Sequence, residues 1–165
     1  MKTKTFIENI NMVTNNFLDN QADLLQSGIN ERTLSAQFAH ELINSGLFNE
    51  YDIDCEYNRL DTEIKRLPPP EDCESNDTEG KTIYPDILIH KRGKSSDNLA
   101  VIEIKKSNNS DTARDIEKLK ALTQQNGGYA YTYGVHLTFD IFKKGKTTAA
   151  CYQEGEQTHK DILEK

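Results

Sequence analysis

Residues 83 to 106, IYPDILIHKRGKSSDNLAVIEIKK, are the stretch that decides the fold. Two runs rich in Ile, Leu and Val, residues 83 to 90 and residues 99 to 106, enclose a polar segment at residues 91 to 98. Apolar runs of this length on either side of a short polar turn predict two β-strands. We expect the two strands to pair as an antiparallel hairpin.

The expected hairpin brings two acidic residues together. If it closes about the middle of its turn, His90 lies opposite Leu99, and the same register places Asp86 opposite Glu103. Directly opposed side chains have Cβ atoms about 4.5–5.5 Å apart, so the two carboxylates would repel each other unless a cation lies between them. The register therefore predicts a divalent cation at this position.

The second strand of the hairpin also carries a lysine on the same face. Side chains alternate along a strand, so Glu103 and Lys105 share one face while Ile104 points into the core. Mg²⁺ prefers carboxylate and carbonyl oxygens, which two acids and the backbone carbonyl of Ile104 would supply. A lysine ammonium beside the metal could orient or deprotonate a water, or neutralise charge on a phosphate.

These residues form a recognisable pattern. Pro85-Asp86, a spacer and then Glu103-Ile104-Lys105 resemble the PD…ExK motif of the PD-(D/E)xK nuclease superfamily, and the resemblance covers about residues 31 to 139. It implies a restriction-endonuclease-like mixed β-sheet flanked by helices, with an αβββαβ core. The alternative is a surface hairpin with ordinary charges.

The resemblance also implies roles for individual residues. In that superfamily the aspartate and the glutamate bind the metal, the lysine assists the water, and a glutamate on the preceding helix often joins the site, here Glu31. The implied catalytic residues are Asp86, Glu103, Lys105 and Glu31, and the implied ligands of Mg²⁺ or Mn²⁺ are Asp86, Glu103, Ile104 and Glu31. An alternative role for Glu31 is to stabilise the helix dipole from the first turn.

Three helices are expected around the hairpin. Residues 4 to 26 have apolar residues at helical spacing, and a second helix runs from Asn30, a good N-cap, to Gly46, with Glu31 on its apolar stripe. The third helix is capped by Ser110 or Asp111 and ends at Gly127-Gly128. Its expected inward residues are Ala113, Ile116, Leu119 and Leu122.

Further strands are expected at residues 51 to 57, 129 to 142 and 147 to 152, and the tail from Gln153 is polar. Residues 61 to 82, with three consecutive prolines, have loop composition and no periodicity, and are expected to be a mobile insertion. The order of elements predicts an α/β fold with a mixed sheet, an extra N-terminal helix and a parallel crossover through residues 99 to 134. A chain of 165 residues is the size of one domain, residues 1 to 165.

The composition favours a protein of the cytoplasm that has no membrane partner. No apolar run is long enough to span a bilayer, no secretory signal is present, and the three cysteines and four histidines lack disulfide or zinc spacing. The net charge of −7 is uneven, because residues 50 to 80 hold eleven acids and three bases whereas residues 81 to 120 hold nine bases and six acids. The basic half contains the candidate site.

We therefore expect a Mg²⁺-dependent nuclease that hydrolyses phosphodiester bonds, with DNA as the expected substrate and RNA or a nucleotide as the alternative. Lys106, Arg114 and Lys118 could contact phosphates, or they could belong to a solvated helix face paired with neighbouring acids. Tyr129, Tyr131 and Tyr133 could stack on bases, or simply pack a sheet face. The alternative function is a catalytically silent module that binds nucleic acid or protein. A homodimer or a partner subunit could supply a recognition surface that the chain lacks.

Overall fold

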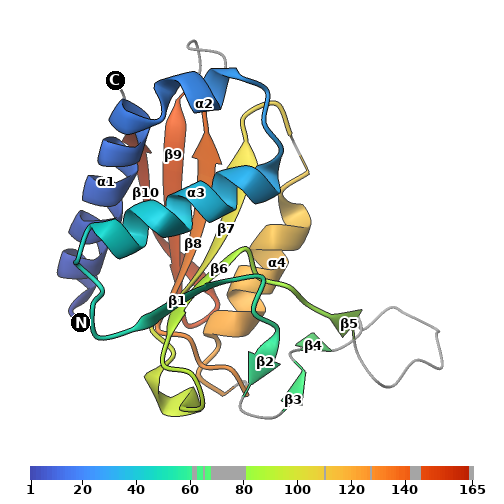
Figure 1. The fold of residues 1–165 in the computed structure, drawn as a ribbon. Coiled ribbons are helices and arrows are strands. Elements are labelled where there is room, and N and C mark those ends of the chain that lie inside the picture. The colour runs from blue at the N-terminus through green and yellow to red at the C-terminus, as the bar shows by residue number, and fades with distance from the viewer. Residues whose placement is uncertain are drawn as a thin grey trace.

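A computed structural model describes residues 1–60, 63–64, 66–67, 81–109, 111–126, 128–141 and 146–163. Its centre is a six-stranded sheet in the order β1-β6-β7-β8-β9-β10 (Figure 1). The strands are β1 (Asp52–Cys55), β6 (Ile87–His90), β7 (Ala100–Lys106), β8 (Tyr133–Phe139), β9 (Thr147–Gln153) and β10 (Glu156–Leu163). Because β7 pairs with β8 in parallel while the other neighbours are antiparallel, the expected mixed α/β sheet is confirmed.

The helices before the sheet are α1 (Thr3–Asn20), α2 (Ala22–Gln26) and α3 (Glu31–Asn44). The single helix expected over residues 4 to 26 is wrong, because the chain leaves the helical conformation at Gln21. The last fully buried residue of α1 is Phe17, and the polar residues Asp19 and Asn20 just before the break are exposed, so they do not hold the chain on the core. The caps of α3 are as expected: the Asn30 side chain accepts a hydrogen bond from the Thr33 N–H, and Gly46 has a φ of +68°.

The hairpin formed by β6 and β7 has the expected register. Ile87 pairs with Ile102 and Ile89 with Ala100, in antiparallel orientation. The first strand is shorter than residues 83 to 90, because β6 begins at Ile87 and Asp86 lies in a bend just before it. Asp86 immediately precedes the last paired residue, Ile87. Extending the register by one residue would place Asp86 opposite Glu103.

The crossover from β7 to β8 passes through α4 (Ala113–Thr123). Its N-cap is Thr112, which makes no side-chain cap hydrogen bond, so Asp111 does not cap it, and Ser110 lies outside the described residues. The expected inward position of Ala113 is also wrong, since this residue is exposed. The buried residues of α4 are Asp115, Leu119, Leu122 and Thr123.

The last strand, β10, was missed by the interpretation of the tail as merely polar. It forms an antiparallel hairpin with β9 through Glu154 and Gly155, which have φ values of +52° and +82°. Two consecutive residues with positive φ are typical of the tight turn that best fits twisted strands. A polar edge strand has no apolar alternation to reveal it, because much of its surface stays in water.

Helices cover both faces of the sheet, and each face has its own core. On one face α1 and α3 pack against Ile102, Ile104, Val135 and Leu137, and Figure 1 shows α3 crossing in front of the strands. On the other face α4 packs against Val101, Tyr131 and Tyr152. Tyr131 and Tyr133 are 0% and 1% exposed, so base stacking by these two rings is excluded.

Just before and within residues 61 to 82, the described part contains short strands: β2 (Arg59–Leu60) pairs with β3 (Glu63–Ile64), and β4 (Arg66–Leu67) with β5 (Lys81–Thr82). The rest of the expected mobile insertion lies outside the described residues. No helix of the described part is both long and apolar enough to cross a lipid bilayer.

Candidate active site

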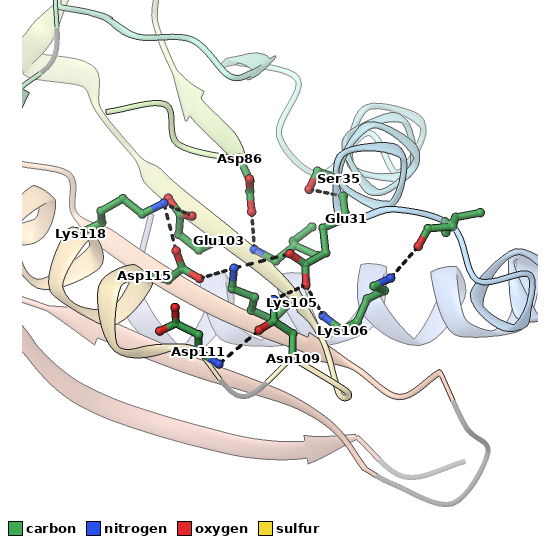
Figure 2. Close-up of polar contacts among 12 residues, drawn as sticks. Glu31, Ser35, Asp86, Glu103, Lys105, Lys106, Asn109, Asp111, Asp115 and Lys118 are labelled. Carbon is green, nitrogen blue, oxygen red and sulfur yellow. Dashed lines mark hydrogen bonds and ion pairs between the residues drawn. The ribbon is translucent and has the colours of Figure 1, made fainter. Parts of the chain in front are cut away.

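The candidate site lies on the α4 side of β7, where the strand approaches its carboxyl end (Figure 2). A helix that connects two parallel strands runs back along the sheet, so its first turns lie near the end of the strand that it follows. Two residues along a strand span about 6.6 Å and three along a helix about 4.5 Å. Asp115 and Lys118 of α4 are therefore placed over Lys105 and Glu103 of β7.

Asp86 is anchored to the backbone of β7. Its Oδ2 accepts a hydrogen bond of 2.7 Å from the N–H of Ile104, and its own carbonyl oxygen accepts one from the N–H of Glu56. The Ile104 side chain is 1% exposed and packs in the opposite core. The fold thus fixes Asp86 next to the Glu103-Ile104-Lys105 segment.

Glu103 is almost completely buried. The residue is 1% exposed, and its Oε2 accepts a hydrogen bond of 2.5 Å from the Nζ of Lys118. Its Oε1 is also buried and has no hydrogen-bond partner among the described residues. A carboxylate oxygen that is removed from water without a partner is costly, so this atom marks a position that suits a ligand.

Asp115 joins the two lysines of the site. Lys105 Nζ lies 3.0 Å from Asp115 Oδ2, an ion pair by distance although not a well-directed hydrogen bond, and Lys118 Nζ lies 3.1 Å from Asp115 Oδ1. Asp115 is 6% exposed. This buried carboxylate fixes both ammonium groups on the α4 side of β7, as the dashed lines in Figure 2 show.

Glu31 reaches the site from the first turn of α3. Its Oε1 accepts hydrogen bonds from the backbone N–H of Lys106 (3.1 Å) and from Asn109 Nδ2 (3.2 Å), while its Oε2 lies 3.5 Å from Lys105 Nζ. The position of Glu31 on the apolar stripe thus directs its carboxylate toward the end of β7. Lys105 lies between Glu31 and Asp115.

Burial controls the charges of the two hairpin acids. It raises the pKa of Glu103 to about 8, with the nearby charge of Asp86 acting in the same direction and Lys118 opposing. Burial also raises the pKa of Asp86, against the opposing effect of the Ile104 N–H. Because the charge of Asp86 makes Glu103 harder to ionise, a cation that neutralised both carboxylates would be bound favourably.

At the two lysines of the site, neighbouring charges outweigh the effect of burial on the pKa. Burial alone would lower the pKa of Lys118, but the charges and hydrogen bonds of Glu103 and Asp115 outweigh it, so the pKa of Lys118 is raised. Burial is likewise outweighed at Lys105, where Asp115 and Glu31 raise the pKa. Both side chains are therefore held as ammonium ions.

The three basic residues that were expected to contact nucleic-acid phosphates are in different environments. Arg114 is exposed, whereas the Lys118 side chain is only 12% exposed and turns into the acidic cluster, so the two do not share a solvent face. Lys106 donates a hydrogen bond of 2.9 Å to the carbonyl oxygen of Ile29. It lines an open polar hollow of about 350 Å³, together with Asn30, Glu31, Asn108 and Asn109.

Sequence reasoning missed Asp115 and His136. Asp115 stands four and seven residues before Leu119 and Leu122, so it lies on the buried stripe of α4, the same signal that singled out Glu31. His136 is the register partner of Glu103 on β8, is 6% exposed, and its Nε2 has no hydrogen-bond partner in the described part of the chain. Burial lowers the pKa of His136. No local pattern distinguishes it from a core histidine.

The described residues include no group of three or more His, Cys, Asp or Glu side chains arranged to hold a metal ion. The donor set still suits a hard cation, because it consists of carboxylates, one of which has an unpaired buried oxygen. Comparisons with models of protein families, with curated proteins and with solved structures gave no significant match for this chain. Arguments about function therefore rest on the residues of the site.

Proposed function

We propose that this chain is a metal-dependent nuclease with a restriction-endonuclease-like fold, related to the PD-(D/E)xK superfamily and acting on DNA. The observation that carries the proposal is the convergence of Asp86, Glu103 and Lys105 beside one buried carboxylate oxygen without a partner. Exposed acids and lysines are common, but a buried cluster of mixed charge at a strand end is typical of a functional site.

In the proposed reaction, Asp86 and Glu103 would hold one or two Mg²⁺ or Mn²⁺ ions, and the Ile104 carbonyl and Glu31 would be further ligands. When bound, the cation would activate water and stabilise the charge that develops on the phosphate. Lys105, kept in place by Asp115 and Glu31, would donate hydrogen bonds to the attacking water or to a phosphate oxygen.

The surroundings of the site are compatible with a nucleic-acid strand. The polar hollow beside Glu31 has amide and ammonium groups that can bind phosphate and sugar oxygens. Arg114 on the exposed face of α4 would add an electrostatic contact. Because the chain is acidic overall, a second copy or a partner subunit would supply additional binding surface.

The test compares cleavage of supercoiled plasmid, linear duplex, single-stranded DNA and RNA, with and without Mg²⁺ or Mn²⁺. Asp86→Asn, Glu103→Gln and Lys105→Met should each lower the metal-dependent rate by about 10²–10⁴-fold, because each removes a group that handles metal or water. Glu117→Gln is the matched control, since Glu117 is an exposed acid on the same helix. If the three folded variants cut as fast as the parent, the proposed site is wrong.

One observation favours the alternative, a catalytically silent module that binds nucleic acid or protein. Lys118 and Lys105 already neutralise part of the acidic cluster within the chain. A module of this kind would bind DNA without cleaving it, and would bind no Mn²⁺ at the cluster. Calorimetric titration with Mn²⁺ therefore separates the two functions independently of any cleavage assay.

A further inference from the structure

The Lys118 ammonium lies between two buried carboxylates. Its Nζ is 2.5 Å from Glu103 Oε2 and 3.1 Å from Asp115 Oδ1, and its side chain is only 12% exposed. A buried ammonium in such a position is itself a bound cation, held by oxygens that are also the preferred ligands of Mg²⁺ and Mn²⁺. The structure thus contains a cation position between Glu103 of β7 and Asp115 of α4, and the second of these residues lies outside the β6–β7 hairpin.

The acids around this position carry more negative charge than the two lysines neutralise. Four carboxylates take part in the cluster: Asp86, Glu103, Asp115 and Glu31. Against them stand the two ammonium groups of Lys105 and Lys118. The formal sum with all groups ionised is negative, and the buried Glu103 Oε1 remains without a partner. A divalent cation would satisfy that oxygen and neutralise more charge than the ammonium does.

We propose that Asp115 is a ligand of the divalent cation, which binds between Glu103 and Asp115 in exchange for the Lys118 ammonium. The inference rests on the proposed metal-dependent function, and it adds one ligand and one competing cation to it. The ammonium keeps its proton and its charge and leaves both carboxylates, and the proton that Glu103 carries below its raised pKa passes to solvent when the cation binds. Two carboxylates with bound waters are sufficient for Mg²⁺, which keeps several waters in most protein sites.

The exchange assigns two successive roles to Lys118. Without the cation it neutralises Glu103 and Asp115, which keeps the buried acids compatible with the fold. With the cation bound, its ammonium is free beside the metal, where a phosphate of the substrate would lie. The first role predicts that Lys118 weakens metal binding, and this can be measured without any nuclease assay.

The first experiment is calorimetric titration of the full chain with Mn²⁺. Lys118→Met keeps the length of the side chain but removes the competing charge, so the dissociation constant should fall about tenfold or more. Lys118→Arg keeps the charge and should leave the constant within about threefold of wild type. Asp115→Asn, which is nearly isosteric, should raise the constant at least about tenfold. Lys105→Met is the matched control, with a smaller effect than Lys118→Met, because among the described residues Lys105 forms ion pairs with Asp115 and Glu31 and none with Glu103.

The second experiment observes the ammonium directly. In ¹⁵N-labelled protein at low temperature the Lys118 Nζ signal, assigned by its loss in Lys118→Arg, should be visible without metal and should disappear or shift at saturating Mg²⁺. A Lys118 signal that stays unchanged at saturation, or an Asp115→Asn variant that binds Mn²⁺ as tightly as wild type, would overturn the inference. If Asp86→Asn and Glu103→Gln still abolish binding, only the exchange is wrong. If wild type and Lys118→Met both bind no Mn²⁺, the proposed metal-dependent function fails as well.

Discussion

The two faces of β7 bury side chains of opposite character, apolar on one side and charged on the other. Ile102 and Ile104 point to the α1 and α3 side, where they pack in an apolar core, while Glu103 and Lys105 face α4. The apolar face gains stability from burial, whereas the charged face loses some of it by desolvating carboxylates. The comparison shows that the stability gained on the apolar face of β7 offsets the cost of burying carboxylates on its charged face.

The largest expected effect breaks the apolar face. Phe38 is 0% exposed and its ring packs against those of Phe17 and Phe139, so Phe38→Ala should lower the free energy of unfolding by about 3–5 kcal/mol. Urea denaturation of both proteins measures it. A loss below about 1 kcal/mol would show that this face does not stabilise the fold as described.

The next prediction adds a cation to the charged face. At a Mn²⁺ concentration about 100 times the dissociation constant, the free energy of unfolding should rise by about 2.7 kcal/mol, because the ion binds only the folded chain. Thermal denaturation with and without Mn²⁺ measures it, and Glu103→Gln is the control that should lose the effect. An equal rise in both proteins would place the bound ion elsewhere.

A change of pH should act on the charged face of β7 rather than on its apolar face. The pKa of Glu103 is about 8 in the folded chain, above its ordinary value of 4.5, so the folded state binds more protons between these limits and stability falls as pH rises through this window. Lys118, with a raised pKa, stays charged throughout the window and adds no slope. Asp86 acts in the same direction as Glu103, and His136, whose pKa is lowered, acts in the opposite direction.

The comparison with Glu103→Gln isolates this contribution. The variant cannot titrate at position 103, so between pH 5 and pH 7 wild type should lose about 2.5 kcal/mol more stability than the variant. Thermal denaturation over this range measures the difference. Parallel pH profiles of the two proteins would contradict the burial of an ionisable Glu103.

The smallest expected effect concerns the surface beyond the charged cluster. Arg114 is exposed, so Arg114→Ala should change the free energy of unfolding by less than about 0.5 kcal/mol. If Arg114 contacts a phosphate, the variant should bind all DNA sequences more weakly and reduce the salt dependence of binding by about one ion. Fluorescence anisotropy at several salt concentrations measures both, and unchanged binding would remove Arg114 from the interface.

The part of the fold that local patterns encode was predictable. The β6–β7 hairpin register followed from two apolar runs and a polar turn, and the Asn30 cap and Gly46 end of α3 followed from backbone preferences of single residues. The break at Gln21 and the strand β10 were not foreseen. Both depend on packing against the rest of the molecule. The residues around Gln21 and those of β10 are mostly polar, so no apolar pattern marks where these elements begin and end.

The residues of the candidate site were likewise predictable only where local patterns place them. The sequence by itself determined that Glu103 and Lys105 share a face of one strand, and that Asp86 stands opposite, since alternation and register are properties of the hairpin alone. Only the tertiary structure decided that α4 turns Asp115 and Lys118 over them, and that Glu31 arrives from α3. The contacts of Glu31, Asp115 and Lys118 with β7 join different elements of the chain, and packing against the sheet, rather than any local preference, sets how α3 and α4 are placed.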